Sequence, residues 1–321
     1  MTDAEARRPD PRAPWLTLDE RDAGREPESE IYEGVPPHLV HDLEAWVSDT
    51  LAEDGVGDLP RLLLNSFRVS WDVPGRMTIR HHAVVRSIIR GETDWARSPR
   101  PLEPLSVLDA LIALHPHWDN TRELLGYTTY RAAWGKRLGK LQELLRDTGS
   151  AWHVDFDLRG LYRRVDPTAT QAWRHARAAA EDGGRSVAAK NLEEAWRLCY
   201  GQHPDPSASY SAAVKAVEAV AVPVIAPGTS KTVHAAARDL RGKLPGWEFV
   251  LVHDKSLPSG SGTADVVSAM LDRLLHGETN RHTSSDHNRP STQAEAETAV
   301  HLAVTLVQWF LAGALTRKVA P

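Results

Sequence analysis

The sequence predicts a mainly helical protein with one small β-hairpin and a helical bundle at its C-terminal end. Apolar residues recur three and four positions apart along most of the chain, which is the spacing of one helix face. Period-two alternation is confined to 151–166. The chain closes with a long apolar segment that opens on the capping box Thr292–Glu295. A length of 321 residues allows about two domains.

The cysteine count and the charge balance exclude two classes of protein. Cys199 is the single cysteine, so an intrachain disulfide is excluded, and with it a secreted scaffold built on disulfides. We therefore expect a cytoplasmic protein. The formal net charge of −5 argues against non-specific coating of nucleic acid, although it permits a local basic groove.

Two segments decide the expectations for targeting and membranes. Residues 1–30 carry five Arg against nine Asp or Glu and are rich in Pro, which predicts a disordered tail and no signal peptide. The most apolar stretch, Ala299–Leu315, is interrupted by His301, Thr305 and Gln308 and falls short of the ~20 residues that span a bilayer. It predicts a buried helix and no membrane association.

The first half of the chain reads as helices followed by the hairpin. After the tail we expect a helical N-terminal domain over 31–150. The expected helices cover 36–47, 60–66, 79–90, 105–114 and 119–146. The region 151–200 is then expected to hold the hairpin and connecting helices, and 201–321 a separate domain.

In the second half of the chain, Pro and capping residues indicate where helices begin and end. Asp205 is expected to cap a helix that starts at Pro206 and ends before Pro223. Thr229 or Ser230 is expected to cap the helix after it. The helices expected in this half cover 167–182, 186–200, 206–222, 230–242, 263–276 and 292–313.

Several familiar signals do not indicate a site. The loop Ser259–Thr263 opens a helix but lacks the Gly-Lys-Ser/Thr ending of a phosphate-binding loop. Fifteen His are scattered without Cys or carboxylates that would complete a metal site, so we expect neither metal nor cofactor. The close His pairs are attributed to chance; they are His38 with His41, His81 with His82, and His115 with His117.

One segment differs from the rest of the chain: Asn280–Asn288, with the sequence NRHTSSDHN. It places a guanidinium, two imidazoles, a carboxylate and several hydroxyls within ten residues, between two expected helices. This concentration is unnecessary for a turn and expensive to bury.

This segment resembles the HEPN superfamily, whose ribonucleases carry Arg, a polar residue, three to five further residues and His. Arg281, His282 and His287 fit that pattern. Five Arg–His pairs in the chain have an allowed spacing, where chance alone predicts about four, so context selects Arg281 and His287. Only this pair precedes a long C-terminal apolar helix.

The wider arrangement is similar to the C-terminal domain of abortive-infection proteins of phage defence. The similarity covers about 201–321 and is carried by Tyr210–Val220, the motif and Ala294–Val304. The region 150–200 also looks like what precedes this domain in those proteins. This chain has Asn288 where the family commonly has Gly, and Asn tolerates the left-handed conformation better than most residues.

The resemblance implies a metal-independent endoribonuclease that cleaves RNA by attack of its own 2′-hydroxyl. His287 would transfer a proton, because imidazole titrates near neutral pH. Arg281 would bind the phosphate through its forked, permanent charge. His282 would orient the substrate or move the second proton. The supporting residues expected from the resemblance are Asp286, Asn280 and Glu218.

The expected partners are an RNA substrate, a second copy of the chain, and an antitoxin or another component of a defence system. The last helix is apolar almost all round, which predicts a homodimer that covers it. Two other functions stay open from sequence. One is a non-catalytic HEPN module that binds RNA, nucleotides or protein, and the other is an all-α oligomerisation scaffold.

Overall fold

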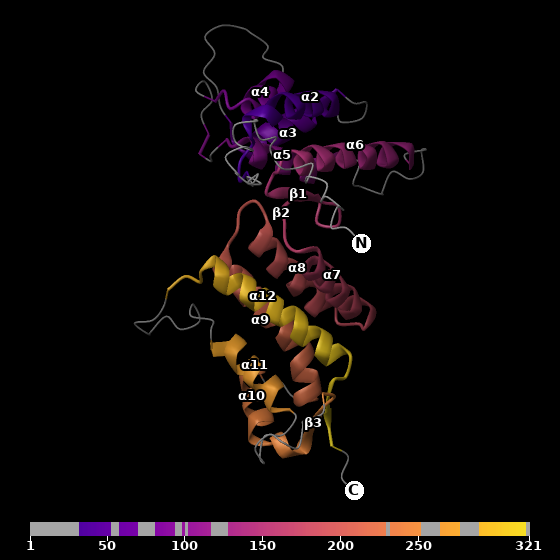
Figure 1. The fold of residues 1–321 in the computed structure, drawn as a ribbon, viewed down its shortest axis with the longest axis vertical. Helices are drawn as coiled ribbons and strands as arrows, with labels where there is room; N and C mark the ends of the chain where they lie inside the picture. The colour runs from indigo at the N-terminus through magenta and orange to yellow at the C-terminus, as the bar shows by residue number, and fades with distance from the viewer. Residues whose placement is uncertain are drawn as a thin grey trace, which may run out of the picture. The chain divides into compact units, whose positions relative to one another are not determined.

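The computed structural model is mainly helical and divides into two compact units, one up to Arg164 and one from Val165 onward (Figure 1). It describes residues 32–52, 58–69, 81–93, 98–99, 102–116, 128–228, 232–251, 264–276 and 289–318, with the backbone alone for 128–131. The expected mainly α class with a small antiparallel hairpin is confirmed. The hairpin belongs to the first unit, and the two helices after it belong to the second.

The first unit packs helices and the hairpin around one apolar core. Trp46 and Trp134 meet at its centre with ring centroids 6.2 Å apart, and Leu161 of the hairpin is fully buried against the same cluster. The elements are a 3-10 helix Pro37–Leu39, α2 Val40–Leu51, α3 Leu59–Ser66, α4 His81–Ile89, α5 Pro104–Leu114, α6 Thr128–Asp147, β1 Trp152–Asp155 and β2 Gly160–Arg163.

A partly buried hydrogen bond joins the hairpin to α5. The backbone N–H of Leu161 donates to Oδ1 of Asp109 at 2.6 Å. Gly160 makes this approach possible, because a Cβ at position 160 would lie only 2.7 Å from the same carboxylate oxygen. The glycine is therefore required by packing rather than by chain flexibility.

The second unit is built around α9. Its elements are α7 Pro167–Asp182, α8 Ser186–Tyr200, α9 Pro206–Ile225, α10 Val233–Gly242, a 3-10 helix Leu244–Gly246, β3 Trp247–Phe249, α11 Asp265–His276, α12 Gln293–Leu311 and β4 Leu315–Arg317. The central helix α9 packs against α8, α10 and α12. Figure 1 shows α12, in yellow, running alongside α9.

Local capping chemistry explains where these helices begin. Oδ1 of Asp205 accepts from the backbone N–H of Ala208 at 2.9 Å, with Pro206 at the first helical position, as expected. The capping box at the start of α12 is also confirmed, since Thr292 and Glu295 each accept from the other's backbone N–H.

Two helix ends differ from the expectation. The helix α9 continues through Pro223 to Ile225. Proline has no N–H, so in this last turn the only helical hydrogen bond lost is the one to the carbonyl oxygen of Ala219, a half-buried residue. The cap of α10 is Thr232, whose Oγ1 accepts from Ala235, so the expected caps at 229 and 230 are wrong. Residues 1–31 and the part of the expected helix from 119 to 127 lie outside the described residues.

The pair β3–β4 was not predicted. Trp247 pairs with Arg317 and Phe249 with Leu315 in an antiparallel register. Each strand has only three residues, which is too short for an alternating pattern to be recognised in the sequence. The two strands are also far apart along the chain.

Most of the apolar circumference of α12 is covered within the chain. This helix packs against α7, α8, α9 and α11, and Val300, Ala303, Leu306 and Val307 are fully buried. Coverage by these helices weakens the physical reason for which a partner was expected, although Leu302, Trp309 and Leu311 are only half-buried. The homodimer stays a prediction.

By length and composition, α9 is apolar enough to cross a membrane. More than half of its most apolar window is buried by neighbouring elements, and its surface carries Lys215 and Glu218. These are the properties of a core helix.

The contact between Gly160 and Asp109 predicts a specific loss of stability. Replacing Gly160 with Ala forces Asp109 away from the Leu161 N–H, which costs about 1–3 kcal/mol of unfolding free energy. The matched control is Gly139→Ala in α6, where a Cβ meets nothing within 4 Å and helix propensity improves by about 1 kcal/mol. Urea unfolding measures both variants, and a Gly160→Ala protein as stable as wild type would contradict the packing argument.

Candidate functional site

The motif connection, residues 277–288 between α11 and α12, contains most of the candidate site. Its residues lie outside the described part of the chain. Those placed there by the sequence are Asn280, Arg281, His282, Asp286 and His287. The structure describes both ends of this connection and the helices around them.

Both ends of the motif connection are fixed to the N-terminal turns of α9. The hydroxyl of Tyr210 donates to the carbonyl oxygen of Leu274, in the last turn of α11, at 2.8 Å. The backbone N–H of Ser291, just before α12, donates to Oγ of Ser207 at 2.9 Å. Ser207 and Tyr210 are three residues apart and share one face of α9. The motif connection therefore leaves and rejoins the bundle at the same end of this helix.

The end at α12 is reinforced by charge. Arg289 donates two hydrogen bonds to the carboxylate of Glu295, at 2.9 Å for Nη1 to Oε2. The guanidinium and the N–H of Thr292 hold the pKa of Glu295 at about 2, below its usual value of 4.5. Arg289 is the second residue after His287, so this exposed ion pair connects the chain just after the motif to the first turn of α12.

Glu218 is the one supporting residue that the structure describes. It lies half-buried on α9, and its Oε1 accepts from the backbone N–H of Val233 at 3.1 Å. Val233 is the first residue of α10, so the carboxylate sits at the positive end of that helix. Its observed contact is structural and holds α10 against α9.

Basic side chains gather on α10 and α11 beside the start of the motif connection. His234 and His276 bring their rings to 6.4 Å, which places the beginning of α10 next to the end of α11. Arg241 pairs with Asp272 at 2.8 Å. The exposed Arg238 and Arg273 form no ion pair with any residue in the described ranges. We call Arg238, Arg273, His234 and His276 the basic surface.

A second polar cluster is enclosed between α8 and α12. The hydroxyl of Tyr200 lies 2.9 Å from Nε2 of His301, and the His301 ring meets Trp196 edge-on. Nε2 of Gln293 donates to the carbonyl oxygen of Cys199 at 2.9 Å and to Glu297 at 3.0 Å. The three α12 residues recur at intervals of four and form one polar stripe that faces α8.

Burial makes this cluster chemically quiet at neutral pH. It raises the pKa of the Cys199 thiol to about 12, with Glu297 adding to the effect, so the thiol stays protonated. Burial lowers the pKa of His301, and Glu297 opposes part of that change, so the imidazole is neutral. Among the residues that the structure describes, no group of three His, Cys, Asp or Glu could hold a metal ion.

Sequence reasoning treated His301 only as an interruption of an apolar stretch. The signal that could have identified the cluster is the spacing of Gln293, Glu297 and His301 on one face of an otherwise apolar helix. A polar stripe on the buried side of a helix requires partners, and α8 provides them.

Comparison with known proteins adds no assignment. No family model matches the chain, and no curated protein or solved structure matches it. The function must therefore be argued from the motif and from the geometry around it.

The buried imidazole predicts a pH-dependent contribution to stability. The folded pKa of His301 lies below the ordinary 6.5 of an unfolded chain, so below about pH 6.5 the unfolded state binds more protons. The stabilisation is complete above that pH and is lost as pH falls toward the folded pKa. Urea unfolding between pH 7.5 and 5 should show a steeper decline for wild type than for His301→Gln. Parallel curves would contradict the burial effect.

Proposed function

We propose that this protein is a metal-independent endoribonuclease with a HEPN-type catalytic domain in its second unit. The observation that carries the proposal is the Arg281–His287 motif on a connection whose two ends are fixed side by side on α9. Both flanks of the motif are therefore held at one end of α9, within the second unit. The resemblance to abortive-infection proteins supports a role as an effector in antiphage defence or in a toxin system.

The proposed chemistry uses only groups of the chain and the RNA. His287 accepts the proton of the 2′-hydroxyl, whose oxygen attacks the adjacent phosphorus. Arg281 binds the non-bridging oxygens as negative charge develops on the phosphorane. The bond to the 5′-oxygen then breaks, and His282 protonates that leaving group, with Asp286 and Asn280 orienting the imidazoles. The products are a 2′,3′-cyclic phosphate and a 5′-hydroxyl end.

The basic surface supports RNA as the substrate. Arg238 and Arg273 are exposed on α10 and α11 without ion-pair partners among the described residues, and His276 is the last residue before the motif connection. Unpaired guanidinium groups bind phosphates and release counterions. The surface therefore gives the RNA backbone a path toward the motif.

A second candidate function is a HEPN module that binds RNA without cleaving it. The same basic surface favours it, because binding requires the guanidinium groups but not the imidazole of His287. The homodimer and an antitoxin or defence-system partner are further proposals that follow from the resemblance.

The motif makes a direct prediction for cleavage. His287→Ala should lower RNA cleavage at least ~10²-fold, the usual loss for a general acid or base. Arg281→Ala should lower cleavage by a similar factor. Arg281→Lys should restore little of this cleavage, because one ammonium group cannot replace the two parallel N–H donors of a guanidinium. Cleavage should persist in EDTA and leave DNA intact, because the 2′-hydroxyl is the nucleophile.

The matched controls come from exposed residues of the same types. His203→Ala and Arg185→Ala remove an imidazole and a guanidinium outside the motif and should leave cleavage unchanged. Equal cleavage by wild type, His287→Ala and Arg281→Ala would refute the catalytic assignment, as would activity abolished by EDTA. Retained RNA affinity without cleavage in wild type would leave the binding module as the better account.

The basic surface predicts the salt dependence of RNA binding. Removing both guanidinium groups in Arg238→Ala/Arg273→Ala should reduce the slope of log affinity against log salt by about 1.4, at ~0.7 for each phosphate contact on single strands. The charge-matched control, Arg185→Ala/Lys190→Ala at the N-cap and in the second turn of α8, should keep the wild-type slope. Titrations of one RNA oligonucleotide between about 50 and 200 mM salt measure it. A slope that falls equally in both double variants would show that net charge alone matters.

A further inference from the structure

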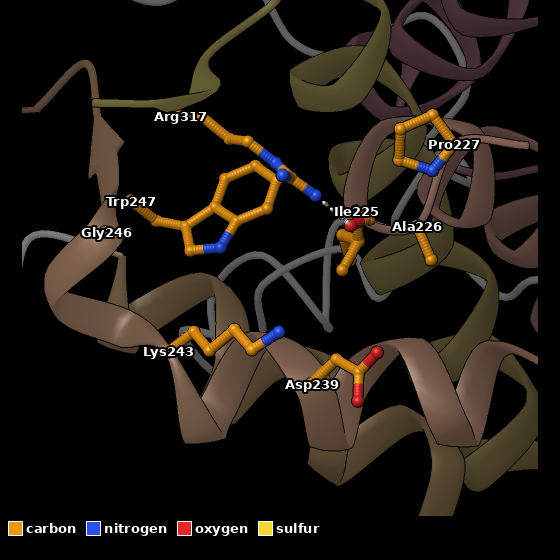
Figure 2. Close-up of a pocket in the computed structure, with 8 residues that line it drawn as sticks. All are labelled: Ile225, Ala226, Pro227, Asp239, Lys243, Gly246, Trp247 and Arg317. Atoms are coloured by element: carbon orange, nitrogen blue, oxygen red, sulfur yellow. Dashed lines mark hydrogen bonds between the residues drawn. The ribbon is translucent and has the colours of Figure 1, made fainter. Parts of the chain in front are cut away.

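The second unit contains a cavity of about 400 Å³ at the C-terminal end of α9 (Figure 2). It lies between the end of α9, the last turns of α10 and the pair β3–β4. Ile225 follows Ser207 by 18 residues, about 27 Å along a helix, so the cavity is remote from the α9 turns that hold the motif connection. Its lining residues are Ile225, Ala226, Pro227, Asp239, Lys243, Gly246, Trp247 and Arg317.

Two cationic side chains line this cavity and have no carboxylate partner among the described residues. The ammonium group of Lys243 forms no hydrogen bond or ion pair with any residue that the structure describes. Arg317 donates from Nη2 to the carbonyl oxygen of Ile225 at 3.0 Å, and it forms no ion pair with the described residues. Figure 2 shows the two cations approaching the cavity from different elements.

The guanidinium of Arg317 is held in place before any ligand arrives. Its carbon lies 5.1 Å from the centroid of the Trp247 ring, a cation–π contact. The backbone is fixed as well, because Arg317 pairs with Trp247 in the strand register and the N–H of Lys318 donates to Gly246 at 3.0 Å. The bond to Ile225 occupies one of the five N–H donors, which leaves a pre-organised fork for an oxyanion.

The other walls favour an organic ligand over a bare ion. Asp239 stands one helical turn before Lys243 and reduces the formal charge of the lining to +1. Its carboxylate can accept from a hydroxyl or amino group. Ala226 and Pro227 add apolar surface, and the volume falls within the range of sites for small organic molecules, about 300–1,000 Å³.

We propose that this cavity binds a small organic phosphate, with Arg317 and Lys243 on the phosphate and Asp239 on a hydroxyl or amino donor. A nucleotide and a sugar phosphate share this chemistry. The proposal does not depend on the nuclease, because none of the lining residues belongs to the motif or to the basic surface.

Isothermal titration of the full chain with AMP, ribose 5-phosphate, adenosine and inorganic phosphate tests the proposal. We expect AMP to bind with a Kd below about 1 mM and adenosine not to bind at that concentration. Ribose 5-phosphate binding as tightly as AMP would identify the sugar phosphate as the recognised unit. Binding of AMP alone would identify a nucleotide.

The variants connect the binding to the cavity. Lys243→Ala and Arg317→Lys should each weaken the binding of AMP at least about fivefold. The first variant removes a positive charge, and the second replaces the paired N–H donors of a guanidinium with an ammonium group. Lys190→Ala and Arg185→Ala, which remove exposed cations away from the cavity, should bind AMP as wild type does. The proposal is overturned if no organic phosphate binds at about 10 mM, a concentration that detects even weak sites. It is also overturned if adenosine or inorganic phosphate binds as tightly as AMP, or if Arg281→Ala abolishes binding that Lys243→Ala retains.

Discussion

The second unit depends on the burial of α9. A 20-residue helix whose sequence is mostly Ala and Val is stable in water only when neighbours cover it, and α8, α10 and α12 do so. Its many small side chains let these helices approach closely, as at Ala213 and Ala216, which are fully buried. Three polar residues of α9 form hydrogen bonds to neighbouring segments. Ser207 and Tyr210 bind the two segments that flank the motif connection, and Glu218 binds the start of α10.

Local chemistry made most helices predictable, and distance in sequence limited the rest. Asp205 with Pro206, and Thr292 with Glu295, announce helix starts because the capping groups lie within three residues. The β3–β4 pair joins Trp247 to Arg317, and no short-range sequence pattern predicts a pairing between residues so far apart. This pairing brings Arg317 to the cavity, so the cavity and its cations could not be predicted from the sequence.

The residues of the candidate site come from the sequence alone, whereas the positions of the segments that flank them come from the structure. The sequence singled out Arg281 and His287 by context, whereas the convergence of both flanking segments on one end of α9 needed tertiary structure. Glu218 illustrates the difference, since its position on the first helix of the domain suggested a role in the site. In the structure its carboxylate accepts a hydrogen bond from Val233 at the start of α10. Spacing in the sequence could not distinguish this structural carboxylate from one in a functional site.

The position of β4 has a consequence for synthesis of the protein. The first unit ends at Arg164 and contains its whole core before the second unit is made. The second unit closes only when α12 and β4, near the end of the chain, reach α9 and β3. At roughly 5–20 residues per second, its 157 residues take about 8–30 s to translate. Until α12 and β4 have been made, the core around α9 is incomplete, so any activity that depends on this core requires the synthesis of both elements.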